Sequence, residues 1–189
     1  VYFGGGTPTT LSPSQLDAML GTIERSFDLS TVREYTVEAG RPDTVTREKL
    51  DTLLLHNVSR ISINPQTFND DVLKSIGRRH TSKQTVDAYN LARQMGIGNI
   101  NMDFIAGLNS DTFDSFKQSI DTAINLSPES ITVHNLALKS GAYLCTENEL
   151  FDLTKRSLAT KMIDYSYNAL TKNAYNPYYM YRQSKSLGN

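Results

Sequence analysis

Apolar residues recur along this chain with two different periods. Leu16, Leu20 and Ile23 follow the spacing of a buried helix face, and the Ser12-Pro13 pair before them is typical of a helix start. Residues 58–63 instead alternate between apolar and polar side chains, as in a half-buried strand. Together the patterns predict strands at 1–3, 35–39, 58–63, 100–105, 130–136 and 178–182, and helices at 14–27, 69–76, 82–95, 112–126 and 147–172, with a further helix that begins at Thr46.

The predicted elements alternate between strand and helix through the whole chain. Such alternation is typical of an α/β fold, in which parallel strands form a sheet and the helices connect them. No linker or low-complexity segment divides the sequence, so residues 1–189 are predicted to form a single domain. Because the chain opens on a strand without an initiator Met, we expect a fragment that is truncated at both ends.

Polar residues and glycines follow one predicted strand after another. In parallel α/β folds the carboxyl ends of the strands lie at one edge of the sheet, where ligands bind. The sequence therefore predicts a single site assembled from several strand ends. The residues at these ends are Gly4, Gly5, Gly6, Thr7 and Pro8 after the first strand, Glu38 in the second, Asn64, Pro65 and Gln66 after the third, Asp103 and Gly107 on the fourth, and His134, Asn135 and Ala137 on the fifth.

The glycine run lets backbone groups approach a ligand closely, because no Cβ atoms stand in the way. It is not a P-loop, since no Lys-Ser or Lys-Thr pair follows it, and the G-x-G-x-x-G spacing of dinucleotide-binding loops is absent. The residues by themselves leave two interpretations open: a tight turn between a strand and a helix, or a ligand-binding loop.

Glu38 and Asp103 are acidic residues inside otherwise apolar strands. A carboxylate in such a place needs a partner, either within the protein or on a ligand. Both acids are therefore either structural or able to bind ribose hydroxyls or an ammonium group. Arg78 is likewise either a solvated cation at a helix end or a partner for a ligand carboxylate.

Composition and charge narrow the classes of function. Hydrophobic residues make up 39% of the 189 residues, the net charge is −1, and no apolar run reaches the roughly 20 residues of a membrane span. We therefore expect a cytoplasmic protein without a nucleic-acid or membrane partner. Because Cys145 is the single cysteine, the chain is expected to form no internal disulfide and no cysteine-only metal site. The Cys145 thiol itself is expected to be inert. The isolated histidines His56, His80 and His134 do not indicate a metal site.

Five segments, in order along the chain, resemble motifs of the radical SAM superfamily, in particular the oxygen-independent coproporphyrinogen III oxidase group and its coproporphyrinogen dehydrogenase (HemZ-type) branch. The resemblance covers nearly the whole chain. The segments are Val1-Tyr2-Phe3-Gly4-Gly5-Gly6-Thr7-Pro8-Thr9, Val37-Glu38 with Arg41-Pro42-Asp43-Thr44, Arg60-Ile61-Ser62-Ile63-Asn64-Pro65-Gln66-Thr67-Phe68, Gly77-Arg78-Arg79-His80, and Asn101-Met102-Asp103-Phe104-Ile105-Ala106-Gly107-Leu108.

The resemblance implies a fold and a chemistry. The fold is a partial (β/α)6 barrel with parallel strands and outer helices, here with the first strand missing. In the family a CxxxCxxC loop after that first strand holds a [4Fe–4S] cluster, and reductive cleavage of S-adenosylmethionine gives a 5′-deoxyadenosyl radical. This chain lacks the loop, so the cluster ligands are expected upstream of Val1, and the chain alone is expected to be inactive.

The resemblance also implies a role for each candidate residue. Gly5, Gly6 and Thr7 would contact the methionine part of S-adenosylmethionine. Glu38, Gln66 and Asp103 would bind its amino or hydroxyl groups, Arg78 would pair with a carboxylate, and Ala137 would line the adenine side of the pocket. No catalytic residue and no metal ligand is assigned within this chain.

The implied reaction is the oxidative decarboxylation of two propionate side chains of coproporphyrinogen III to vinyl groups, in porphyrin and haem biosynthesis. The implied partner is therefore a tetrapyrrole substrate, together with an electron donor that the sequence does not identify. Two alternatives stay open: a haem-binding chaperone that keeps the radical SAM scaffold, and a radical SAM enzyme acting on another substrate.

Overall fold

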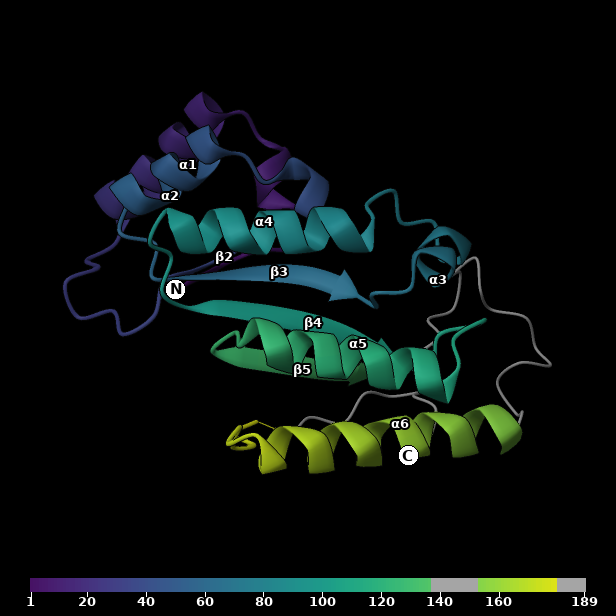
Figure 1. The fold of residues 1–189 in the computed structure, drawn as a ribbon. Helices are drawn as coiled ribbons and strands as arrows, with labels where there is room; N and C mark the ends of the chain where they lie inside the picture. Colours follow the sequence, from purple (N-terminus) through teal and green to yellow (C-terminus); the bar gives the residue numbers. More distant parts are fainter. Residues whose placement is uncertain (137–152, 180–189) are drawn as a thin grey trace. The chain divides into compact units, whose positions relative to one another are not determined.

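The computed structural model describes residues 1–136 and 153–179; strands and helices follow one another along the first range, and the second range holds one helix (Figure 1). The strands are β1 (Tyr2–Phe3), β2 (Thr36–Glu38), β3 (Arg60–Gln66), β4 (Ile100–Ala106) and β5 (Ser130–Asn135). The helices are α1 (Pro13–Ser26), α2 (Arg47–Leu55), α3 (Asp70–Ser75), α4 (Ser82–Gln94), α5 (Phe113–Leu126) and α6 (Leu153–Lys172), with short 3-10 helices η1 (Pro8–Thr10) and η2 (Pro42–Thr44).

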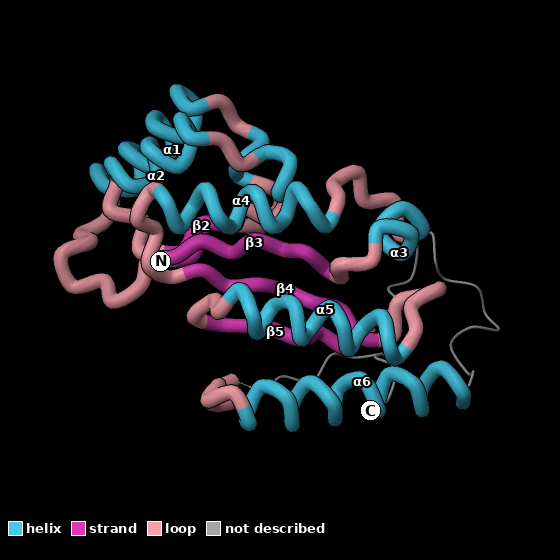
Figure 2. Tube along the Cα trace, viewed as in Figure 1, coloured by secondary structure: helices cyan, strands magenta, loops and turns pink. Residues whose placement is uncertain are grey.

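The strands form one five-stranded sheet in the order β1-β2-β3-β4-β5, drawn in magenta in Figure 2. β1 pairs with β2 and β2 with β3 in parallel, and the register aligns Tyr2 with Thr36 and Thr36 with Arg60. Neighbours in the sheet are also neighbours in the sequence, so each connection returns the chain to the next strand position. The predicted α/β fold with parallel strands and connecting helices is confirmed.

Side-chain caps begin the helices where the sequence predicts them. Ser12 accepts a hydrogen bond from the Gln15 N–H while the Gln15 side chain bonds back to the Ser12 N–H, which is a capping box. Thr81 and Gln84 form the same arrangement before α4. Since each cap satisfies backbone N–H groups that lack partners within the helix, these starts depend on local sequence alone.

The third strand is longer than predicted. Asn64, Pro65 and Gln66 were expected to follow it, but β3 continues through all three. The fixed φ of Pro65 is compatible with extended backbone, so this proline does not end the strand. Gln66 ends it instead, with a left-handed φ of 67°.

Two predictions near the C-terminus fall partly outside the described residues. The predicted helix 147–172 is described from Leu153 onward, as α6. In the predicted strand 178–182, Tyr178 and Tyr179 belong to no helix or strand, and the rest lies outside the described residues. No helix in the described ranges is both long and apolar enough to span a membrane.

The chain divides into two compact units, and the prediction of a single domain stays a prediction. The first unit comprises residues 1–65, 79–103 and 128–131, and the second comprises residues 66–78, 104–127 and 132–189. The first unit has a core in which α1 and α2 contribute fully buried leucines and β3 contributes isoleucines. These residues are Leu16, Leu20, Leu50, Leu53, Ile61 and Ile63.

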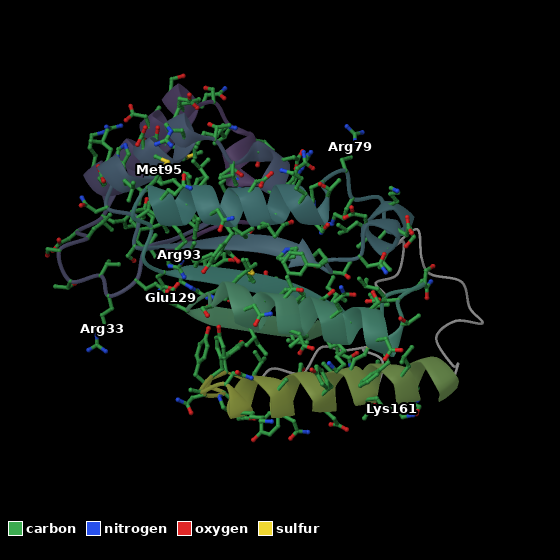
Figure 3. All side chains as sticks on the ribbon, viewed as in Figure 1. Arg33, Arg79, Arg93, Met95, Glu129 and Lys161 are labelled. Carbon is green, nitrogen blue, oxygen red and sulfur yellow. The ribbon has the colours of Figure 1, made fainter. Side chains whose placement is uncertain are left out.

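A salt bridge holds residues 128–131 in the first unit. The Arg93 Nη2 atom of α4 lies 2.8 Å from both carboxylate oxygens of Glu129 (Figure 3). The same carboxylate accepts a hydrogen bond of 2.9 Å from the Ile100 N–H at the start of β4. Although partial burial acts the other way, these contacts lower the pKa of Glu129. The bridge therefore links α4, β4 and the segment that enters β5.

The second unit is built around the end of β4 and the helices α5 and α6. Phe104, Phe116 and Met162 are fully buried there. The Gly107 N–H points at the Met162 sulfur at 3.3 Å, and the Tyr165 hydroxyl donates to Asp121 at 2.5 Å. These contacts attach α6 to the strand and helix that precede it in the unit.

Candidate functional site

In the first unit, β3 has two chemically different faces. Its odd-numbered residues Ile61 and Ile63 are fully buried, whereas Arg60, Ser62 and Asn64 project to the opposite face, because side chains alternate along a strand. Neighbouring strands repeat the pattern. We call the resulting surface the polar face; its residues in the first unit are Tyr2, Thr36, Glu38, Arg60, Ser62, Asn64, Asn101, Asp103 and Ser130.

The Glu38 carboxylate is anchored at the end of β2. One oxygen accepts a short hydrogen bond from the Tyr2 hydroxyl, and the other accepts one of 3.2 Å from the Gly5 N–H. A Cβ atom at Gly4 would lie 2.6 Å from the Tyr2 ring and 2.7 Å from the Glu38 carboxyl carbon. Only glycine therefore fits at position 4 while Glu38 keeps this place.

The next two glycines face open space. An ideal Cβ atom at Gly5 or Gly6 would meet nothing within 4 Å, and Gly5 has a φ of +102°. The backbone at these positions is therefore accessible to a ligand beside the Glu38 carboxylate. Thr7 is the residue that caps the start of η1, and its side chain makes no cap hydrogen bond there.

The glycine loop is fastened to the segment after β2. The Lys49 ammonium donates to the Thr9 carbonyl at 2.5 Å and to the Thr44 carbonyl at 3.1 Å. The Thr9 and Thr44 hydroxyls are also 2.6 Å apart. These bonds join the Gly4–Thr9 segment to the Arg41–Thr44 segment, so two of the predicted motifs form one structural element.

Asp103 belongs to a second group of hydrogen bonds on the polar face. Its Oδ1 atom accepts a bond of 2.6 Å from the Asn101 amide nitrogen, which also donates to Ser62 Oγ at 2.9 Å. Glu38 is in register with Ser62. Asp103 and Glu38, the two acids singled out in the sequence, thus lie on strands that flank β3, and both are only partly buried.

The electrostatics of this face favour a neutral tyrosine beside the two acids. Partial burial raises the pKa of Tyr2, and the hydrogen bond to Glu38 and the charge of Asp103 raise it further, against the effect of Arg60. Tyr2 therefore keeps its proton, and its hydroxyl donates a hydrogen bond to Glu38. The acids lie near enough to affect the same hydroxyl group, and both are of the right chemistry to accept hydrogen bonds from ammonium or hydroxyl groups.

Gln66 and Arg78 belong to the second unit. Gln66 is buried, with 6% exposure, and its left-handed backbone is uncommon for a residue with a side chain, a type of strain that is frequent at functional sites. Arg78 is half-buried just after Gly77, while the adjacent Arg79 is exposed and points away from the chain in Figure 3. Ala137 lies outside the described residues.

The histidines have structural surroundings. His80 is buried, with its Nε2 atom 3.3 Å from the Pro65 carbonyl, and His56 lies between the Asp17 and Glu24 carboxylates. His134 is half-buried on β5. In the described ranges, no group of three or more His, Cys, Asp or Glu side chains could hold a metal ion. Cys145 lies outside the described residues.

Several residues of the polar face were not among the predicted site residues. They are Tyr2, Arg60, Ser62, Asn101 and Ser130. A signal for two of them is present in the sequence, since Arg60 and Ser62 precede the predicted Asn64 at every second position of a strand whose buried side chains Ile61 and Ile63 are apolar. Carrying this period through β3, rather than looking only beyond its end, would have found them.

Comparisons with known proteins identify the family to which this chain belongs. Residues 1–123 match the model of the Radical SAM superfamily. The oxygen-independent coproporphyrinogen-III oxidase-like protein HemZ of Bacillus subtilis is 42% identical over 190 aligned residues, covering 100% of this chain and 38% of that protein. The heme chaperone HemW of Lactococcus lactis is 33% identical, covering 94% of this chain and 47% of that protein. The chain thus spans less than half the length of either relative.

A solved structure agrees in fold. Coproporphyrinogen III oxidase (HemN) from Escherichia coli, described as a radical SAM enzyme, superposes with a TM-score of 0.77 at 24% identity, over 93% of this chain and 40% of that one. At this identity the likeness concerns the fold alone. The match of the family model to well over half of the chain is the decisive finding, and this chain belongs to the Radical SAM superfamily.

Proposed function

We propose that the polar face of the first unit binds S-adenosylmethionine and that Glu38 and Asp103 receive its ammonium or hydroxyl groups. The observation that carries this proposal is the Glu38 carboxylate, which is anchored by Tyr2 and Gly5 beside a glycine loop that is open to a ligand. In the superfamily, S-adenosylmethionine and a [4Fe–4S] cluster supply the radical chemistry that a polypeptide lacks.

The residues present fit S-adenosylmethionine but not the cluster. Carboxylates suit ammonium and hydroxyl groups, and the Gly5–Gly6 backbone leaves room for close approach. The chain's single cysteine cannot supply the three thiolates of a cluster loop. The roles of Thr7, Gln66, Arg78 and Ala137 toward S-adenosylmethionine stay predictions that rest on the family resemblance.

The binding proposal is tested with isosteric variants of the full-length gene product. Glu38→Gln and Asp103→Asn keep the shape of each side chain but remove a charged acceptor, so we expect the affinity for S-adenosylmethionine to fall about 10- to 100-fold in each. Isothermal titration calorimetry measures the affinity, and Asp87→Asn on the exposed side of α4 is the control. Unchanged affinity in both site variants would remove these residues from the site.

We further propose that the protein carrying this chain converts propionate side chains of coproporphyrinogen III to vinyl groups with loss of CO2. The 42% identity to the oxidase-like protein HemZ over the whole chain supports this substrate. The protein's part in such a reaction is to orient the substrate and exclude water around it. Because the chain spans 38% of that relative, the substrate and the reaction are proposed for the whole protein and not for this chain alone.

A second candidate function is haem transfer, because a heme chaperone HemW is also 33% identical over nearly the whole chain. Anaerobic assay of the reconstituted full-length gene product with coproporphyrinogen III separates the two functions. Vinyl products detected by mass spectrometry support the oxidase. Stoichiometric haem binding without any vinyl product supports the chaperone and overturns the oxidase proposal.

A further inference from the structure

Six side chains of the polar face form a continuous chain of hydrogen bonds across three strands of the first unit. The bonds run from Arg60 Nη2 to Ser130 Oγ (3.0 Å), from Ser130 Oγ to Asn101 Oδ1 (2.9 Å), from Asn101 Nδ2 to Asp103 Oδ1 (2.6 Å) and Ser62 Oγ (2.9 Å), and from Ser62 Oγ to Asn64 Oδ1 (2.9 Å). This series of hydrogen bonds thus connects the Arg60 guanidinium to the Asp103 carboxylate.

The direction of these bonds follows from the chemistry of the end groups. A guanidinium has donors only, so Ser130 must accept from Arg60. The one hydroxyl proton of Ser130 is then available for the Asn101 carbonyl oxygen. With its oxygen facing Ser130, the Asn101 amide must turn its NH2 group toward Asp103 and Ser62. The opposite orientation would place the amide oxygen against a carboxylate, which is repulsive.

Burial makes the arrangement specific. Asn101 is 3% exposed and Ser62 4% exposed, so water does not readily replace a lost partner. The Arg60 side chain is 13% exposed and is itself held by Glu34 at 3.3 Å. A charged group buried to this extent has a fixed position, and so do the hydroxyl and amide groups that it orients.

We propose that Asn101 is a positioning residue for the Asp103 carboxylate and that Arg60, acting through Ser130, sets the orientation of the Asn101 amide. This inference rests on the proposed function, in which Asp103 contacts S-adenosylmethionine. Asn101 keeps one Asp103 oxygen engaged, so that the carboxylate stays in one rotamer. An Asp103 side chain held in one place loses less conformational entropy when the ligand binds.

The test is a double-mutant cycle of Asn101→Leu and Asp103→Asn in the full-length gene product, because leucine is close to asparagine in shape but forms no hydrogen bonds. We expect Asn101→Leu to weaken binding of S-adenosylmethionine about tenfold when Asp103 is present and less than about twofold in the Asp103→Asn background. The same cycle, measured by urea unfolding of the ligand-free protein, is expected to show coupling of about tenfold in the unfolding constant.

Ser130→Ala provides a milder variant should Asn101→Leu fail to fold. It removes the donor to the Asn101 oxygen and is expected to weaken binding severalfold, with no additional loss when combined with Arg60→Met. Thr85→Val is the matched control: it removes the hydroxyl of a fully buried residue of α4, which bonds the carbonyl of the cap residue Thr81, so it lowers stability but leaves the affinity unchanged.

The outcomes separate this inference from the binding proposal. Unchanged affinity in Asp103→Asn alone overturns the role of Asp103 as a ligand contact. Absence of coupling between positions 101 and 103, in unfolding as well as in affinity, overturns the positioning role of Asn101. An equal loss of affinity for S-adenosylmethionine from Asn101→Leu with Asp103 and with Asn at position 103 also overturns it. A merely structural asparagine would affect binding independently of Asp103.

Discussion

The two faces of the sheet in the first unit are made from the same strands but are held by different interactions. On one face, Ile61 and Ile63 are fully buried, and they stabilise the fold because their apolar area is removed from water. On the other, Arg60 and Ser62 occupy the intervening positions and are held by hydrogen bonds in defined directions. The difference shows that side chains that bury apolar area and side chains that are oriented by hydrogen bonds are separated by a single step along a strand.

The largest expected effect tests this separation on adjacent residues of β3. Ile63→Ala removes buried methyl and methylene groups, so we expect the free energy of unfolding to fall by about 2–4 kcal/mol. Asn64→Ala removes one acceptor of a hydrogen bond on the half-buried polar face, so the expected loss is about 1 kcal/mol or less. Urea unfolding measures both. Equal losses would mean that the two faces do not differ in the way described.

A smaller effect on stability, with a large effect on binding, is expected at the glycine loop. Gly4→Ala would force a Cβ atom to 2.6 Å from the Tyr2 ring and so displace Tyr2 and Glu38. We expect a stability loss of about 1–2 kcal/mol and at least about tenfold weaker binding of S-adenosylmethionine.

Gly98→Ala is the control for this glycine, because an added Cβ atom there meets nothing within 4 Å. Calorimetric titration of both variants makes the comparison. If Gly4→Ala bound S-adenosylmethionine as tightly as Gly98→Ala, the anchored position of Glu38 would have no part in recognition.

The smallest expected effect concerns the helices that contribute to the core of the first unit. His56, at the end of α2, lies 3.0 Å from carboxylate oxygens of Asp17 and Glu24 on α1. Although burial alone would lower the pKa of His56, these two acids raise it above its ordinary value. The protonated form therefore stabilises the fold fully below about pH 6.5, and this contribution is lost as the pH rises through the raised pKa.

His56→Gln should remove this pH dependence. We expect a loss of about 1 kcal/mol at pH 6, because both acids are partly exposed and screened, and a smaller loss at pH 9. Thermal unfolding across this pH range in the parent and the variant is the measurement. Parallel curves would show that the ion pairs do not contribute to stability.

Much of the fold could be predicted from local pattern. The Ser12 and Thr81 caps depend on residues within one helical turn, so the starts of α1 and α4 were placed to within a residue. The end of β3 was misplaced because Pro65 is compatible with a strand and because the left-handed φ of Gln66 leaves no signal in a residue type that rarely adopts it.

The sequence by itself was enough to predict the order of strands and helices. It also singled out the acids Glu38 and Asp103 and the glycine loop as candidates for a site. Only the tertiary structure decided which polar groups meet. Asn101 and Ser62 are 39 residues apart, and Tyr2 and Glu38 are 36 apart, yet each pair is hydrogen-bonded. The physical reason is that strand order and register bring distant positions together, whereas spacing along the chain reports only on neighbours within one element.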